Sequence, residues 1–195
     1  MIIKDNVVVY SNDVQLTTEG AMGGKGLSAF IDPNTNLDTA QFVDQQMPGS
    51  YKAGELFYNN GDFTLTSRGL ETLIERKKNN VRNSFNETIK TQEISGVEYH
   101  GEYDSILKMD GALRLAETAG LTEIKLYDTS NNGHVFSIAD AKVLVGQLGE
   151  VYQQLFDIKQ TKMVELESVD TSGVDATDST GAVAQVEAIN TSVSI

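Results

Sequence analysis

The chain has 195 residues, and its 28 acidic against 15 basic side chains give a formal net charge of -13. Because nucleic acids and anionic membrane surfaces attract Lys and Arg, this balance argues against both as partners. The absence of cysteine excludes disulfides, thiolate catalysis and Cys-based zinc sites. The first residues predict neither a signal peptide nor a membrane span, so no membrane insertion is expected.

Residues 1–54 are expected to form a β-prone N-terminal arm that attaches the protein to a partner. The opening IIKDNVVVY is rich in branched residues, and the following SND is typical of a turn. Few apolar positions recur over 17–54, which predicts an extended or loosely built segment. Its GGKG is no phosphate-binding loop, because Gly26 stands where that loop requires Ser or Thr.

Residues 55–166 are expected to form an α+β core domain of small hairpins and amphipathic helices. Two aromatic and branched runs flank Asn60-Gly61, a pair that tolerates the positive φ values of a tight turn, and they predict a β-hairpin. Apolar residues then recur at helical spacing over about 68–91. A second helix is expected to end at a C-cap formed by Gly120.

The stretch VEYHGEYDS, residues 97–105, raises the question of a catalytic cluster. In a single strand its alternate polar residues would all point to one face; they are Glu98, His100, Glu102 and Asp104. We expect Gly101 to reverse the chain, which separates these side chains. The stretch is then a corner that leads into a helix capped by Asp104 or Ser105.

Alternating apolar residues on both sides of Asn132-Gly133 predict a second hairpin. The residues from Asp128 to Gly133 resemble the start of a calcium-binding EF-hand loop, but Ala139 stands where that loop requires Glu, which favours a turn. The two histidines lack the spacing of a zinc site, and no serine-hydrolase elbow is present. No catalytic, cofactor-binding or metal-binding residue is predicted, and an enzyme is not expected.

Ser137 followed by Asp140 is a capping-box pattern, and it predicts the start of a long helix over about 138–165. Apolar residues at alternating spacings of four and three match a short coiled coil; this heptad seam consists of Leu144, Leu148, Val151, Leu155 and Ile158. Two alternatives remain open. The seam packs against the chain's own 68–91 helix, or it packs on another subunit and drives oligomerisation.

Residues 167–195 are dominated by Ser, Thr, Asp, Gly, Ala and Val and contain no Lys, Arg or aromatic residue. Such a composition cannot bury enough apolar surface to fold alone. We expect either a solvated C-terminal tail or, for its branched last part, a strand that adds to a partner's sheet edge.

The layout from about Leu73 to Leu166 also carries a family resemblance. The charged helix LIERKKNNVRNSF, the turn EYHGEYDS and the helix ILKMDGALRLAETAG come first. The strand pair IKLYDTSNNGHVFSI and the long helix ADAKVLVGQLGEVYQQLFDIKQTKM follow. This order resembles a domain family of uncharacterised function found in tail proteins of tailed bacteriophages. In that family the turn typically reads aromatic, polar, Gly, variable, aromatic, Asp, as residues 99–104 do here. Family members also commonly carry a Trp in the strand near Leu126, and this chain has none.

The resemblance implies a structural virion protein of a phage tail, made in the cytoplasm of the bacterial host. It would be a fibre, a fibre connector or a baseplate-associated component that docks to other tail proteins as a homo-oligomer, a trimer by analogy. Two alternatives are a tail-fibre assembly chaperone and a host-surface glycan-binding module. In the second, Tyr51, Tyr58 or Tyr127 would stack on sugars.

Overall fold

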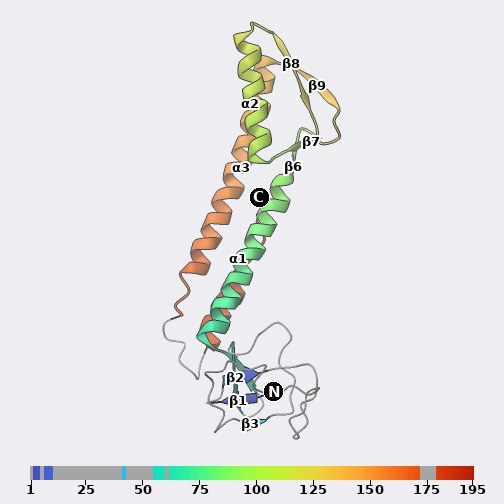
Figure 1. Ribbon diagram of the computed structural model, residues 1–195. Coiled ribbons are helices and arrows are strands. Elements are labelled where there is room, and N and C mark those ends of the chain that lie inside the picture. The colour runs from blue at the N-terminus through green and yellow to red at the C-terminus, as the bar shows by residue number, and fades with distance from the viewer. Residues whose placement is uncertain (1, 5–6, 11–40, 43–54, 60–61, 172–178) are drawn as a thin grey trace, which may run out of the picture. The chain divides into compact units, whose positions relative to one another are not determined.

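The computed structural model describes residues 2–4, 7–10, 41–42, 55–59, 62–171 and 179–195 (Figure 1). Its helices and small antiparallel sheets confirm the expected α+β class with a long helix late in the chain. The chain divides into two compact units, of which the first comprises 1–77 and 166–189 and the second 78–165 and 190–195. The second unit reaches 165, one residue from the expected boundary at 166, whereas the expected boundary at 54 falls inside the first unit.

The first unit contains an antiparallel sheet with the strand order β3-β1-β2-β4-β5. β1 (Ile2–Lys4) pairs with β2 (Val7–Tyr10), as the β-prone opening predicts, and with β3 (Gln41–Phe42). β4 (Leu56–Asn59) and β5 (Asp62–Leu65) form the predicted hairpin, because their register places Asn59 opposite Asp62. The rest of the predicted arm and the GGKG segment lie outside the described residues.

Helix α1 (Ser67–Lys90) follows β5, as the apolar periodicity predicts. Thr66 caps its start, since the side-chain Oγ1 accepts the backbone N–H of Gly69 at 3.1 Å. Leu70, Leu73 and Ile74 are buried along one face of the helix. The first turns of α1 therefore supply apolar side chains to the interior of the first unit.

The tail prediction is wrong for the described part of 167–195, where Thr180–Ala188 form helix α4. Two contacts hold α4 in the first unit. The Oγ of Ser179 accepts the backbone N–H of Leu65 in β5 at 3.1 Å, and Lys77 of α1 forms a 2.7 Å ion pair with Glu187. Tertiary contacts thus order a segment whose own composition could not.

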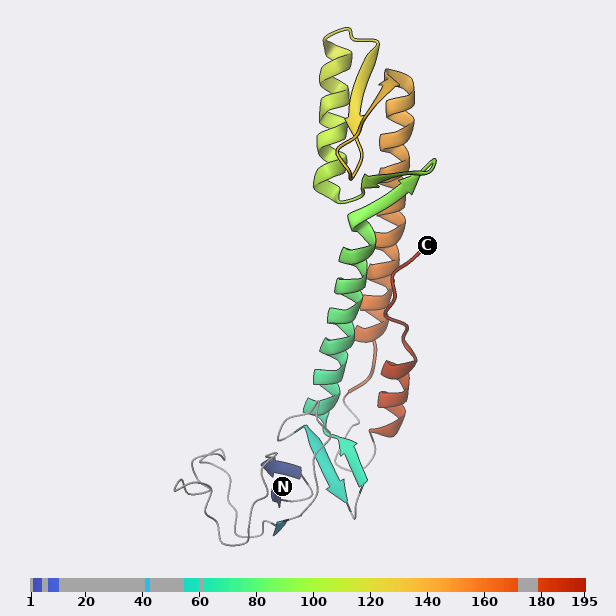
Figure 2. The same ribbon diagram turned by 90° about the vertical axis from the view of Figure 1, so that its right-hand side faces the viewer.

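The core of the second unit forms where α2 (Tyr103–Thr118) and α3 (Ile138–Glu167) meet the hairpin of β8 (Glu123–Tyr127) and β9 (Gly133–Ser137) (Figure 2). Its buried members include Ile106 and Leu113 from α2, Leu126 from β8, and Leu144 and Leu148 from α3. A two-stranded hairpin is at best marginally stable alone, so β8 and β9 depend on this contact with the helices.

Both helix ends predicted in this unit are confirmed. Gly120 has a φ of 71° and donates to the carbonyl of Glu117 at 2.9 Å, while Leu121 donates to the carbonyl of Ala116 at 3.0 Å; the two bonds form a Schellman motif. The long helix begins with the capping box. The Oγ of Ser137 accepts the N–H of Asp140 at 3.1 Å and donates to its carboxylate at 2.7 Å.

A hairpin that the sequence reading missed precedes α2. β6 (Thr91–Ile94) pairs with β7 (Val97–His100), and the turn is Ser95-Gly96. Their φ values of 54° and 80° are those of the type I′ turn that suits a two-residue hairpin loop. The chain therefore reverses before VEYHGEYDS and not within it.

The expected role of Gly101 is wrong, because this residue has no positive φ and makes no turn between strands. It is a glycine because a Cβ there would collide with the side chain of Gln92 and lie 2.8 Å from the carbonyl oxygen of Ile89. The expected cap is wrong too. Glu102 occupies the N-cap position of α2 and makes no side-chain capping hydrogen bond, so neither Asp104 nor Ser105 caps the helix.

The chain itself covers the heptad seam. Leu148 and Leu155 are fully buried and Leu144 is nearly so, whereas Val151 and Ile158 are half-buried. The upper part of the seam packs into the cluster with α2 and the hairpins. Lower down, Phe85 of α1 packs edge-on against Tyr152 and Phe156 of α3, with ring centroids 5.9 and 6.2 Å apart. Packing within the chain accounts for the seam, and its use between subunits stays a prediction.

The last residues lie beside α3 in the second unit (Figure 2) and are bonded to α1 as well. Val193 is 1% exposed, its N–H donates to the Oγ of Ser84 at 2.8 Å, and its carbonyl accepts the hydroxyl of Thr88 at 2.8 Å. Lys162 of α3 donates to the carbonyl of Asn190 at 2.6 Å. The segment that could have added to a partner's sheet is therefore held by two helices of its own chain.

The burial of the seam makes a prediction about stability. Leu148→Ala should lower the free energy of unfolding by about 2–5 kcal/mol, because the lost side chain leaves a cavity in the core. Val164→Ala, at a 62% exposed site on the same helix, is the control and should change it by less than about 0.5 kcal/mol. Urea denaturation measures both. Equal, small effects together with a change of oligomeric state for Leu148→Ala would instead indicate an intersubunit seam.

Candidate functional site

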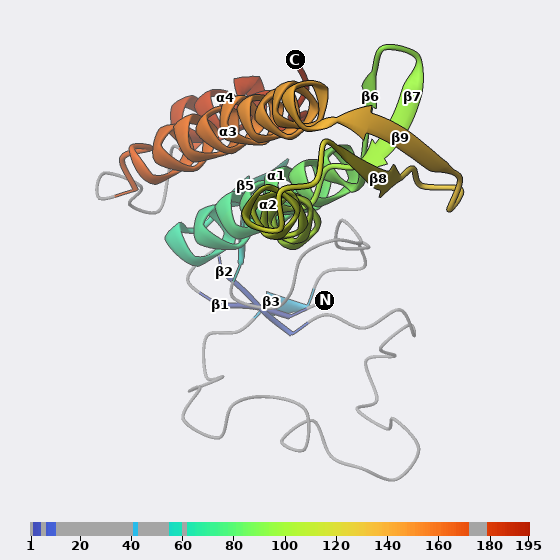
Figure 3. The ribbon, with the colours of Figure 1, turned by 90° about the horizontal axis from the view of Figure 1, so that it is seen from above.

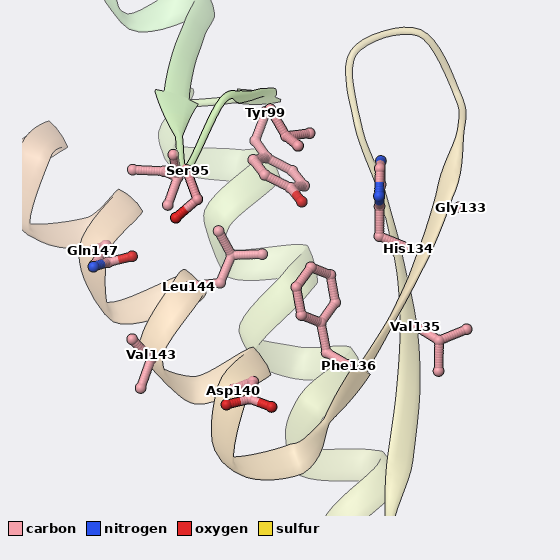
Figure 4. A pocket seen from close by; sticks show the side chains of 12 residues that line it. Ser95, Tyr99, Gly133, His134, Val135, Phe136, Asp140, Val143, Leu144 and Gln147 are labelled. Atoms are coloured by element: carbon pink, nitrogen blue, oxygen red, sulfur yellow. The ribbon is translucent and has the colours of Figure 1, made fainter.

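A pocket of about 590 Å³ opens in the second unit beside β9 (Figure 4). Its walls come from the β6–β7 hairpin, from β9 and from the first turns of α3. Among the described residues, none from β8 or α2 lines it. Seen from above, the β6–β7 hairpin lies on the side of β9 opposite β8 (Figure 3). Its volume falls within the range of roughly 300–1,000 Å³ that is usual for ligand sites. We call it the β9 pocket.

The lining of the β9 pocket is mixed, with apolar side chains beside polar groups. Tyr99 from β7, Phe136 from β9 and Leu144 from α3 point into it, whereas Val135 points away (Figure 4). Tyr99 is 2% exposed, and its burial, with the nearby charge of Asp128 as the second cause, raises the pKa of its hydroxyl above the ordinary 10.0. The phenol therefore stays protonated at neutral pH and can act as a hydrogen-bond donor.

The loop between β8 and β9 is built around one buried carboxylate. The strands pair up to Tyr127 and Gly133, so the loop spans 128–132 and Asn132-Gly133 is not the turn itself, which corrects the sequence expectation. Asp128 Oδ1 accepts the backbone N–H groups of Ser130 and Asn132 at 2.9 and 2.8 Å. The EF-hand-like stretch is thus a turn whose first carboxylate binds its own backbone, as favoured from the sequence.

His134 of β9 closes this network. Its Nε2 lies 3.0 Å from Oδ2 of Asp128 and carries a proton there, because an ionised carboxylate can only accept. This hydrogen bond is the largest cause that lowers the pKa of Asp128, to about 2 from an ordinary 3.8, and bonds from Asn132 and Ser130 add to it against the opposing effect of burial. The pair fixes the loop at one end of the β9 pocket.

The polar residues of VEYHGEYDS do not form a site. Glu98 and His100 are exposed on β7, while Glu102 and Asp104 belong to the start of α2. The pairing of His134 with Asp128 was missed. Only the strand register of β8 with β9 brings the two side chains together, and their spacing in the sequence does not indicate it.

The remaining sequence candidates divide between described and undescribed residues. Tyr127 is 52% exposed, and the Nζ of Lys125 lies 5.5 Å from the centre of its ring. Tyr51 and the side chain of Tyr58 lie outside what the structure describes. Within the described ranges, no group of three or more His, Asp or Glu side chains could hold a metal ion, and no helix is long and apolar enough to cross a membrane.

A second surface feature lies on α2. Tyr103, Leu107, Gly111 and Leu115 are spaced by four residues and form one ridge of the helix. Their large side chains are 54%, 48% and 73% exposed, and a Cβ at Gly111 would meet nothing within 4 Å. We call this row the α2 ridge. Helices pack by such ridges, so this exposed apolar row is the kind of surface that marks a protein interface.

Scans against protein-family models and searches of curated proteins and of solved structures found no match to this chain.

The Asp128 network predicts a pH dependence of stability. Because folding lowers the pKa of Asp128, its contribution is fully present above the unfolded value near 3.8 and is lost as the pH falls toward about 2. Asp128→Asn should therefore be less stable than wild type at pH 7 and should flatten the loss of stability between pH values of about 4 and 2. Urea unfolding at several pH values measures this. Asp157→Asn, on the exposed face of α3, is the control and should leave the wild-type profile; a wild-type profile in Asp128→Asn would contradict the assignment.

Proposed function

We propose that this protein is a non-catalytic structural component of a bacteriophage tail, such as a fibre, a fibre connector or a baseplate-associated protein. It works by docking to other tail proteins and to copies of itself. The observation that carries the docking part is the α2 ridge. Its leucines and tyrosine remain exposed although the opposite face of the same helix is buried with Ile106 and Leu113.

The ridge has the chemistry of a helix-packing surface. Burying apolar side chains contributes about 25 cal/mol per Å², so Tyr103, Leu107 and Leu115 together offer a sizeable driving force for association. Gly111 in the middle of the row lets another backbone approach closely, since no atom of the chain fills the space above it. Charged residues flank the row, among them the ion pair of Arg114 with Asp110 at 2.8 Å, and can form the polar rim of an interface.

The tail assignment is supported by the order of the elements. The resemblance requires a charged helix, a turn, a second helix, a strand pair and a long helix. The chain has them in that order as α1, the junction of β7 with α2, α2, β8–β9 and α3. Residues Tyr99, Gly101 and Tyr103 of the family's turn mark the point where β7 ends and α2 begins.

Docking through the ridge is tested by removing its apolar side chains. The double variant Leu107→Gln and Leu115→Gln should convert a self-associated chain into a monomer in sedimentation velocity, because the polar amides gain nothing from burial. Circular dichroism should stay unchanged, since both side chains are exposed. The unfolding midpoint should equal that of wild type at concentrations low enough for wild type to be monomeric as well. Val164→Gln, at a 62% exposed site on α3, is the control and should associate like wild type. A wild-type chain that is monomeric at every concentration would contradict docking to copies of itself through the ridge.

The tail role itself is tested on purified phage particles. Mass spectrometry should find this chain in the virion at a copy number comparable to that of other tail proteins. Detection only in infected-cell extracts, and not in purified particles, would favour the alternative of an assembly chaperone.

A further inference from the structure

We propose that the free edge of β9, together with the β9 pocket, is a docking site for an extended strand of another protein, which adds to the β8–β9 sheet as its third strand. The strand runs antiparallel to β9. It carries a Lys or Arg near its start and apolar side chains at the second and fourth positions after that residue. This inference does not depend on the tail assignment or on the α2 ridge.

The pattern of backbone hydrogen bonds in the β8–β9 hairpin leaves the outer edge of β9 free to pair. Ile138 donates to the carbonyl of Thr122 at 3.1 Å, and Asp128 donates to that of Asn132 at 3.0 Å. Both pairs lie opposite each other when the pairing of β8 with β9 is extended by one residue at either end. Because such bonds alternate along an antiparallel pair, the residues opposite each other at 124 and 136 and at 126 and 134 bond to one another. The N–H and C=O groups of Gly133 and Val135 therefore point away from β8, toward the side where the pocket opens.

Alternate side chains of a strand added to this edge would face the β9 pocket. In a sheet, opposed residues on neighbouring strands share a face. Residues of an added strand opposite His134 and Phe136 would thus share the face of the β9 pocket, above Leu144, whereas the residue opposite Val135 would face solvent with it (Figure 4). Val143 on α3 is 60% exposed beside this space, so the floor on which a third strand would lie is already apolar.

Charge indicates whether the added strand comes from a different protein or from a second copy of this chain. Edge strands are normally protected by charged side chains, but β9 reads GHVFS and has none. Among the described residues that line the pocket, only Asp140 is charged. It follows the C-terminal end of β9 and already accepts the hydroxyl of Ser137. An antiparallel strand places its first residues at that end, where a cation would meet the carboxylate. A second copy that paired through its own β9 would bring an uncharged strand and a chain of net charge -13.

The proposal is tested with short random peptides displayed on ribosomes and selected on the immobilised full chain. We expect enriched sequences with a basic residue followed by apolar residues at the second and fourth positions. Val143→Glu should remove the enrichment by placing a charge in the apolar floor. Val164→Glu introduces the same charge on an equally exposed site of α3 outside the pocket, and should retain the enrichment.

The backbone pairing is tested on the best peptide by N-methylation and fluorescence anisotropy. Methylating the nitrogen opposite Val135 should weaken binding about tenfold or more, because it removes a hydrogen bond to the edge. Methylating either neighbouring nitrogen should leave the affinity nearly unchanged. Equal effects at all three positions, or selected peptides that bind Val143→Glu as well as wild type, would overturn the proposal. So would self-association of the chain that Val135→Pro abolishes while no peptide is enriched, since that result makes a second copy the occupant.

Discussion

Leu148 lies fully buried on α3, within the cluster where α2 and the β8–β9 hairpin close on the helix, and the second unit depends on this contact. Each hairpin of the unit has two strands, which is too few for independent stability. Tyr99 from β7 and Leu126 from β8 join the same cluster, so both hairpins are held by the buried face of α3. Full burial of a leucine side chain is worth roughly 1.5–3 kcal/mol, and the face supplies several such residues.

The small size of the two-stranded β8–β9 sheet also explains why the β9 pocket exists. A sheet of two strands covers α2 and only part of α3, and it leaves Val143 exposed next to the covered Leu144. The β9 pocket is the space that a wider sheet would have filled. The hydrogen-bonded Asp128 and His134 hold the loop at one end of this space, and the capping box of Ser137 and Asp140 fixes the other. The edge of β9 is therefore presented in a defined position.

Local signals predicted the elements whose chemistry is local. The Ser137 and Asp140 capping box, the Gly120 cap and the apolar period of α1 each depend on residues within a turn or two, and the structure has all of them. The β6–β7 hairpin was missed because its strands carry polar and charged residues. Its turn was marked only by Ser95-Gly96, a pair that the prominent Gly101 obscured.

The site could not be predicted because it depends on register and on contacts between distant residues. The pairing of Asp128 with His134 and the outward direction of the edge at Val135 follow from which residues of β8 and β9 lie opposite each other. Similarly, α4 forms where composition indicates a tail, since contacts such as that of Ser179 with β5 order it. No property of the segment alone contains that information.

The heptad seam shows the limit of periodicity in another way. Leucines at spacings of four and three must be buried, but the pattern is the same whether the covering surface is α2 and the hairpins of the same chain or another subunit. Here the chain supplies the cover, and Leu148 is not available to a partner.

The opposite holds for α2, which is apolar on two faces. Ile106 and Leu113 are buried by the chain, whereas the α2 ridge is not, and a helix with a second apolar row is expected to have a second neighbour. Within the described residues, Tyr103 at one end of the ridge contacts the ring of Tyr152, with ring centroids 5.6 Å apart, whereas Leu107 and Leu115 remain exposed. The surface proposed for assembly is therefore this row outside the heptad pattern.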